Sequence, residues 1–193
     1  MMNNDAIAAI TDEIINLYKH FGQSDYIGEK VSQIQHMTQC AILAESEGYD
    51  DEVILAAFLH DIGHLLESKF PVSRMSQFGV VDHEKIGHDF LLKCGFSHRI
   101  AKSVEAHVSA KRYLTYKYPE YYEQLSEASK ATLEFQGGKM SESEAATFEE
   151  DDNYQLFVAI RKWDDLAKNP ALSVPSLEKY ESLIYQHLSK NAQ

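Results

Sequence analysis

The chain has 193 residues, of which 44% are hydrophobic and 25% charged, a composition that excludes intrinsic disorder and fits one globular domain. Its formal net charge is −12, from 30 acidic and 18 basic residues. A surface this acidic repels phosphate backbones and anionic lipids, so we expect neither nucleic acid nor a membrane as a partner. An anionic ligand would require the few basic residues to be gathered in one place.

The two cysteines and the N-terminus indicate the compartment. Cys40 and Cys94 lie in apolar helical sequence, where buried free thiols are the usual state. The first five residues lack the basic and apolar regions of a secretory signal, and no apolar run is long enough to cross a bilayer. We therefore expect a cytoplasmic protein.

Apolar residues recur with a helical period along the whole chain, and no segment alternates convincingly with period two. In chain order, the expected helices cover about residues 7–21, 29–47, 52–68, 82–94, 97–109, 125–135, 154–168 and 176–189. A loop begins at Pro71, an irregular aromatic segment spans 113–122, and an acidic, solvated segment spans 141–152. We predict a single all-α domain over residues 1–193, built as a helical bundle.

The third expected helix carries the first chemical signal. Residues 53–59 are apolar on every side, so this helix should be central and buried. It runs into the sequence His60-Asp61-Ile62-Gly63-His64. A buried ionised carboxylate requires a cation or a metal as partner. For the doublet alone, a hydrogen-bonded core histidine at a capped helix end is the alternative.

Further potential metal ligands occur on other expected helices. They are His36, His83, His107 and Asp164, with Asp165 as an alternative to Asp164. Imidazole and carboxylate ligands suit iron, manganese or zinc, and the absence of a ligating cysteine argues against a structural zinc site. Four histidines and two aspartates are enough for two metal ions that share one carboxylate.

The order of these residues resembles the H…HD…D signature of the HD-domain superfamily, whose members are all-α bundles. The resemblance covers about residues 24–168. It implies that His36, His60, Asp61 and Asp164 bind one metal ion. It also implies that His83 and His107 bind a second ion, with Asp61 bridging the two.

A narrower resemblance concerns the segment Ser24–His36. This segment is similar to the start of the PhnZ group of HD-domain diiron oxygenases, which cleave the carbon–phosphorus bond of 2-amino-1-hydroxyethylphosphonate to give glycine and phosphate. The related myo-inositol oxygenases are longer, and their sugar-specific segments have no counterpart here. The resemblance implies two iron ions in the mixed-valent Fe2+/Fe3+ state, with a small phosphonate and O2 as substrates.

The same resemblance assigns roles to residues outside the ligand set. It implies that Tyr26 binds an iron in the resting state and that Glu29 contacts the substrate amine. His64, Lys111, Ser129, Thr132 and Arg161 match residues that surround the phosphonate. Asp61 and His64 are the expected catalytic residues. The family pattern also favours Asp164 over Asp165, because Asp164 directly follows Trp163.

Helical spacing supports two of these roles independently. Lys111 lies four residues after His107, and Arg161 lies three residues before Asp164, so each cation shares a helix face with a candidate ligand. Either could instead be a solvated surface residue, as could Ser129 and Thr132, and Tyr26 could be a core residue. We expect His20, His98 and His187 to lie on the surface.

Three alternatives remain open at this stage. The substrate could carry a trimethylated amine, which would need carboxylate or cation–π contacts near Glu29, from Tyr26, Tyr113 or Tyr116. The same ligands could serve an HD-type phosphohydrolase, in which two divalent metals activate a water molecule. The chain could also be a non-catalytic metal-binding regulator.

Overall fold

In the computed structural model, which describes residues 2–26, 28–67, 69–70, 72–75 and 79–192, regular secondary structure is helical and no strand forms. The predicted all-α fold is therefore confirmed. Ile27 and Pro71 lie outside the described residues. The helices are α1 (Asn4–Phe21), α2 (Gln33–Ser46), α3 (Asp51–Leu59), α4 (Ile62–Leu65), α5 (His83–Lys93), α6 (His98–Lys117), α7 (Pro119–Gln124), α8 (Glu127–Phe135), α9 (Glu142–Glu149), α10 (Tyr154–Leu166) and α11 (Glu178–Asn191).

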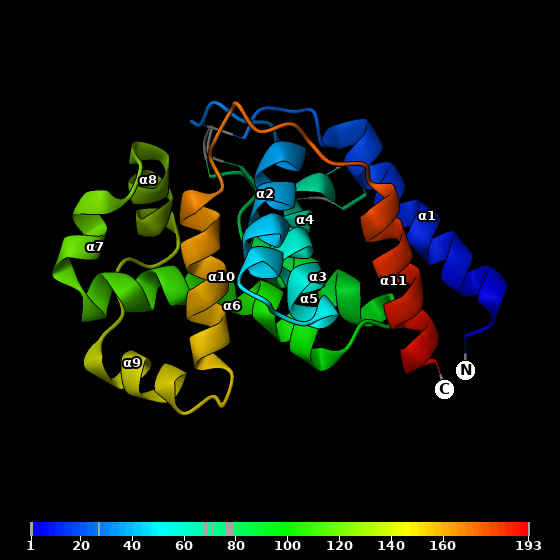
Figure 1. Ribbon diagram of the computed structural model, residues 1–193. Helices are drawn as coiled ribbons and strands as arrows, with labels where there is room; N and C mark the ends of the chain where they lie inside the picture. Colours follow the sequence, from blue (N-terminus) through cyan, green and yellow to red (C-terminus); the bar gives the residue numbers. More distant parts are fainter. Residues whose placement is uncertain (1, 27, 68, 71, 76–78, 193) are drawn as a thin grey trace.

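Helix α3 forms the centre of the bundle, with α2, α6, α10 and α11 packed against it (Figure 1). Its residues 53–59 are all buried, as their apolar sequence predicts. The ring of Phe58 stacks between Tyr18 of α1 and Tyr180 of α11, at centroid distances of 4.2 and 4.0 Å. The Tyr18 hydroxyl also donates to the Phe58 carbonyl at 2.6 Å. The helix that leads into the His–Asp doublet is thus fixed on several sides.

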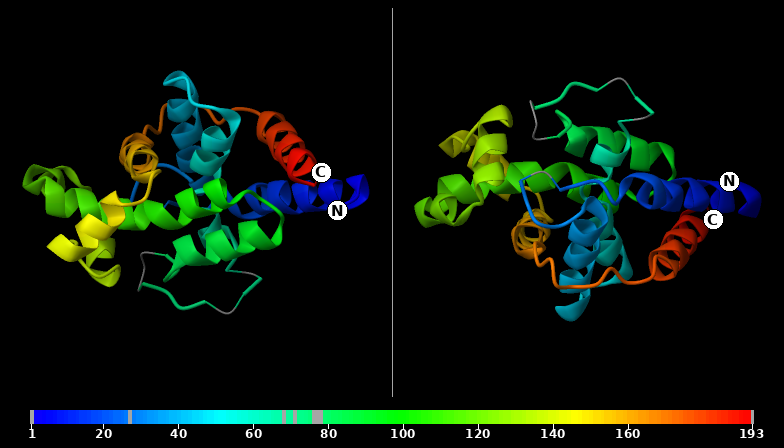
Figure 2. Two further views of the ribbon diagram at one scale, coloured as in Figure 1. Left: turned by 90° about the horizontal axis from the view of Figure 1, so that it is seen from below. Right: turned by 90° about the horizontal axis from the view of Figure 1, so that it is seen from above.

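The long helix α6 crosses the molecule and connects the main bundle to α7 and α9 (Figure 2). It packs against α3, α5 and α10 in the main bundle, and against α7 and α9 beyond it. The first turn of α1 and the last turn of α11 lie close together at one end of the bundle (Figures 1 and 2). No helix among the described residues has the length and apolarity that a bilayer crossing requires.

The predicted single helix over residues 52–68 is wrong, because the chain breaks at the His–Asp doublet. His60 caps the C-terminus of α3, and Asp61 leaves the helical region with φ −106° and ψ 14° before α4 begins. Residues on both sides favour helix, so their periodicity gives no sign of the break. The break lets His60 and Asp61 adopt directions that one continuous helix would not allow.

The second helix also starts later than predicted, at Gln33 instead of Glu29. Ser32 is extended and forms a capping box with Gln35, which satisfies free N–H groups at the helix start. Gly28 has a φ of +83°, and a Cβ there would lie 2.7 Å from the Cβ of Ala128 on α8. The segment with Tyr26 and Glu29 is therefore a turn held against α8.

Two further expectations need correction, and a third is incomplete. Residues 113–122 are not irregular, because α6 continues to Lys117 and the first helix breaker, Pro119, takes the favourable first position of α7. The acidic segment over 141–152 is largely exposed as expected, and it also contains a helix, α9. His187 is buried, not on the surface, because its ring stacks on Phe96, and its Nε2 accepts the backbone N–H of Ser97 at 3.1 Å.

Candidate metal centre and active site

The carboxylate of Asp61 lies between two pairs of histidines. Its Oδ2 atom lies 3.6 Å from Nε2 of His36 and 3.5 Å from Nε2 of His60. Its Oδ1 atom lies 3.3 Å from Nε2 of His83 and 3.4 Å from Nε2 of His107. All five side chains are buried. Each oxygen of one carboxylate thus faces its own histidine pair, which is the arrangement expected of a ligand that bridges two cations.

The four histidines are held in the tautomer that binds metals through Nε2. Each Nδ1 lies within hydrogen-bonding distance of a backbone carbonyl, which can only accept, so Nδ1 carries the hydrogen. The pairs are His36 with Ala167 (3.0 Å), His60 with Ala57 (2.8 Å), His83 with Val80 (3.3 Å) and His107 with Val104 (2.6 Å). The Nε2 lone pairs then meet at 3.1 Å between His36 and His60, and at 3.2 Å between His83 and His107. Facing lone pairs repel unless a proton or a metal ion lies between them, and the donor set fits two metal ions.

The pKa shifts at the site also favour a bound cation. Burial alone would lower the pKa of His60, but the Asp61 carboxylate outweighs it and holds this pKa well above its usual value. Burial would likewise raise the pKa of Asp61, whereas the neighbouring histidines hold it well below its usual range. The centre therefore favours bound positive charge.

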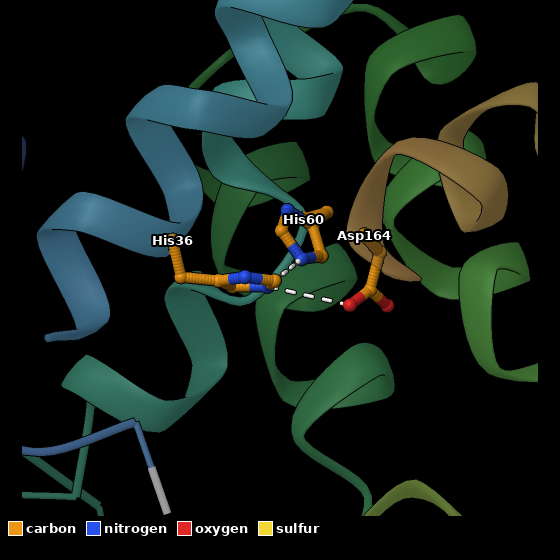
Figure 3. Close-up of side chains that lie close together, drawn as sticks. All are labelled: His36, His60 and Asp164. Carbon is orange, nitrogen blue, oxygen red and sulfur yellow. Dashed lines mark hydrogen bonds and ion pairs between the residues drawn. The ribbon is translucent and has the colours of Figure 1, made fainter. Parts of the chain in front are cut away.

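Asp164 completes the group around His36 and His60. Its Oδ1 lies 3.3 Å from Nε2 of His36, and the three side chains offer ligand atoms close enough to share one ion (Figure 3). His36 comes from α2, His60 from the end of α3 and Asp164 from α10. Asp165 points to a different set of partners, because it accepts hydrogen bonds from Arg161 and from the Tyr121 hydroxyl. Of the two adjacent aspartates, the structure brings only Asp164 into this group.

His64 lies beside the second group, and its ligand atoms are near those of Asp61 and His83. Its Nδ1 accepts the backbone N–H of Val80 at 3.2 Å, so its hydrogen resides on Nε2. Burial and the nearby His83 hold the pKa of His64 well below its usual value. A neutral ring with a hydrogen on Nε2 is a hydrogen-bond donor, which distinguishes His64 from the four ligand histidines.

Gly63 allows the second histidine pair to approach Asp61. A Cβ at Gly63 would lie 2.0 Å from the backbone oxygen of His83 and 2.9 Å from its Cα. No side chain fits there unless the backbone at the start of α5 moves. The glycine of the His-Asp-Ile-Gly-His sequence therefore sets the distance between Asp61 and His83.

A cavity of about 60 Å³ opens beside the two groups. Of the predicted site residues, His36 and His60 are fully buried and do not line it. The others all line it: Tyr26, Glu29, Asp61, His64, His83, His107, Lys111, Ser129, Thr132, Arg161 and Asp164. Parts of the chain that are distant in sequence thus meet at one cavity, as expected of a substrate site.

Two buried cations supply positive charge at this cavity. Nζ of Lys111 donates to Oγ1 of Thr132 at 2.9 Å, and burial, aided by the charge of Arg161, lowers the pKa of Lys111 to about 7. Arg161 lies 2.5 Å from Oδ2 of Asp164 through Nη1 and also bonds to Asp165. Basic side chains are therefore gathered at the interior site of this acidic chain, although Arg161 is paired there with two carboxylates.

Tyr26 lies next to the first ligand group. Its ring stacks on His36 at a centroid distance of 3.8 Å, and its hydroxyl lies 3.4 Å from Oδ1 of Asp164. Burial, reinforced by the carboxylate of Asp164, raises the pKa of Tyr26 well above its usual value. The phenol oxygen is thus close to the atoms that would hold a metal ion.

Sequence reasoning did not identify several polar residues near the cavity, among them Gln33, Gln136 and Lys168. Oε1 of Gln33 is buried and has no hydrogen-bond partner among the described residues, and the residue lines the cavity. Nζ of Lys168 donates to Oε1 of Glu29 at 2.7 Å. Gln33 lies three residues before His36 on α2, so the helical spacing applied to Lys111 and Arg161 could have found it. Lys168 lies beyond the end of α10, where this spacing no longer applies.

Comparison with known proteins gives matches along most of the chain. Residues 34–147 match the HD domain family. An uncharacterised protein of Acanthamoeba polyphaga mimivirus is 44% identical over 98% of this chain and 86% of its own length. The glycine-betaine-forming [1-hydroxy-2-(trimethylamino)ethyl]phosphonate dioxygenase of Leisingera caerulea is 35% identical over 94% of this chain and 92% of its own length. The hydroxymethylphosphonate dioxygenase of Gimesia maris is 37% identical over 88% and 83%, respectively.

Proposed function

Because the chain belongs to the HD-domain family, we propose that it is a diiron oxygenase that cleaves the carbon–phosphorus bond of an α-hydroxyphosphonate. The observation that supports this most directly is the Asp61 carboxylate, which lies between two histidine pairs beside a cavity with buried cations. Two relatives of known activity, both named as dioxygenases of hydroxyphosphonates, add to this support.

Within this class we propose 2-amino-1-hydroxyethylphosphonate as the substrate, with glycine and phosphate as products. Glu29 lines the cavity and offers a carboxylate to the amine. The N-trimethylated hydroxyphosphonate is the alternative, and the Leisingera relative is named for that substrate. In both cases the net reaction adds one oxygen atom to carbon and one to phosphorus, and O2 is the oxidant.

The metal ions would be held by His36, His60 and Asp164 on one side and by His83 and His107 on the other, with Asp61 shared. When bound, two iron ions in the Fe2+/Fe3+ state would supply the redox chemistry and bind substrate oxygens.

The protein residues would bind and orient the phosphonate. Lys111 and Arg161 would neutralise its charge, and the fork of Arg161 can bind two oxygens if it exchanges one carboxylate partner. Ser129 and Thr132 would donate from α8, and His64 would donate from Nε2. Tyr26 would leave the metal group when substrate arrives.

The test is to reconstitute the protein anaerobically with iron, add the aminohydroxyphosphonate, and admit O2. We expect phosphate and glycine to form only after O2 is admitted. Equal phosphate release without O2 would overturn the proposal and favour the HD phosphohydrolase, which shares the same ligands. A metal analysis that finds manganese or zinc with phosphatase activity would point to the same alternative.

A further inference from the structure

The carboxylate of Glu29 is already paired in the protein. Nζ of Lys168 lies 2.7 Å from Oε1 of Glu29 and 3.2 Å from Oγ of Ser126. The side chains of Lys168 and Glu29 are only 16% and 14% exposed. Ser126 in turn donates to Oγ of Ser129 at 3.2 Å. Lys168 thus contacts Glu29 directly and Ser129 through Ser126, and both Glu29 and Ser129 line the cavity.

The backbone holds Lys168 in this position. Lys168 follows α10, and its N–H donates to the carbonyl of Leu166 at 2.8 Å. The preceding residue, Ala167, is fully buried and its carbonyl bonds to Nδ1 of His36. The backbone next to Lys168 is therefore hydrogen-bonded to a candidate metal ligand. This bond fixes the position from which Lys168 reaches Glu29.

This pair determines the charge where the cavity meets Glu29. A free Glu29 would favour a substrate with a cationic substituent on the hydroxyl-bearing carbon. With Lys168 on one oxygen, the pair is neutral, and an incoming ammonium must share the carboxylate with a second cation. A substrate without a cation avoids this repulsion.

We propose that Lys168 is a specificity-determining residue that neutralises Glu29 and lets the site accept hydroxyphosphonates that carry no cation. This inference rests on the proposed function. For hydroxymethylphosphonate the balanced reaction with O2 gives formate, hydrogen phosphate and one proton. The carbon–phosphorus bond breaks, carbon and phosphorus each gain one oxygen atom, and O2 accepts the four electrons.

The experiment compares two substrates on the iron-reconstituted enzyme. We measure kcat/KM for phosphate release from 2-amino-1-hydroxyethylphosphonate and from hydroxymethylphosphonate. We expect the wild type to use both, with values within about tenfold of each other. Lys168→Met, which keeps the aliphatic stem, should raise the ratio in favour of the amine by about tenfold or more, as expected for one lost charged partner.

Matched variants separate charge from packing. Lys168→Arg should keep the wild-type ratio, because the positive charge remains. Lys162→Met removes a lysine from an exposed position of α10 and should also leave the ratio unchanged. Adding Glu29→Gln to Lys168→Met should remove the gain for the amine.

The outcomes distinguish the two proposals. If both substrates release phosphate but Lys168→Met leaves the ratio unchanged, the inference about Lys168 is wrong and the oxygenase proposal stands. If no hydroxyphosphonate releases phosphate, the oxygenase proposal fails. Calorimetric titration of the two phosphonates under anaerobic conditions then still tests Lys168, because the ratio of their Kd values should shift by the same factor. An unchanged Kd ratio would overturn the inference.

Discussion

The Nε2 atoms of His36 and His60 lie 3.1 Å apart, although each ring uses its Nδ1 hydrogen on a backbone carbonyl. The same contact recurs at 3.2 Å between His83 and His107. Between the two pairs lies the carboxylate of Asp61, with one oxygen toward each. The candidate centre therefore consists of two similar halves with one carboxylate between them.

Removal of this carboxylate should affect both halves. We expect Asp61→Ala to lower bound iron from two ions to less than one per chain, as measured by elemental analysis after reconstitution. Circular dichroism checks that the helices remain. Full metal content in a folded variant would exclude Asp61 as a bridge.

The candidate ligands could be predicted from the sequence because their residue types are unusual in apolar helices. His36 and His60 were identified by residue type and order, whereas the choice of Asp164 over Asp165 also needed the family resemblance. The break between α3 and α4 was not, because residues on both sides of Asp61 favour helix. Nor was the contact between Glu29 and Lys168, which are 139 residues apart and meet only in the folded chain.

The adjacent aspartates of α10 should differ in function. Asp164→Asn should lose metal from the His36–His60 half, because a neutral amide is a weaker ligand. Asp165→Asn should keep the metal but loosen Arg161, which Asp165 holds together with Tyr121. We expect KM for the phosphonate to rise by about tenfold in Asp165→Asn. Metal loss from Asp165→Asn with full retention in Asp164→Asn would reverse the assignment.

Lys111 should make phosphonate binding depend on pH. Burial lowers its pKa to about 7, so the ammonium that attracts an anion is lost as the pH rises above 7. We expect the affinity for inorganic phosphate, used as a probe in calorimetry, to fall above pH 7. Lys111→Met should bind phosphate more weakly than the wild type at pH 6, and its affinity should fall much less above pH 7. An identical pH profile in both proteins would exclude Lys111 as the source.

The lowered pKa of Lys111 also affects the stability of the phosphate-free protein. The lowered pKa means that the unfolded chain binds more protons than the folded one between about pH 7 and the usual lysine value near 10.5. The contribution of Lys111 to the free energy of unfolding should thus increase as the pH rises through this interval. Comparison of urea denaturation of wild type and Lys111→Met at several pH values measures it.

Tyr26 should be detectable by spectroscopy. Its hydroxyl lies 3.4 Å from Asp164 Oδ1, close enough to reach an ion in that group. A phenolate on Fe3+ gives a visible charge-transfer band, which we expect in the reconstituted resting protein and not in Tyr26→Phe. Substrate addition without O2 should bleach the band in the wild type. A band that persists in Tyr26→Phe would assign it to another group.

Gly63 offers a way to disturb one half of the centre. In Gly63→Ala the new Cβ would meet the backbone oxygen of His83 at 2.0 Å, so the start of α5 must move away from Asp61. We expect a loss of about 1–3 kcal/mol in the free energy of unfolding, typical of overpacking, and loss of the ion bound by His83 and His107. The half with His36, His60 and Asp164 should keep its metal.

Gly87→Ala is the matched control on α5, because its Cβ would approach only side-chain atoms closely, Val104 Cγ1 at 3.1 Å. Elemental analysis should then find about one iron per chain in Gly63→Ala and two in Gly87→Ala, and two irons in both would show that the contact between Gly63 and His83 does not control the second half.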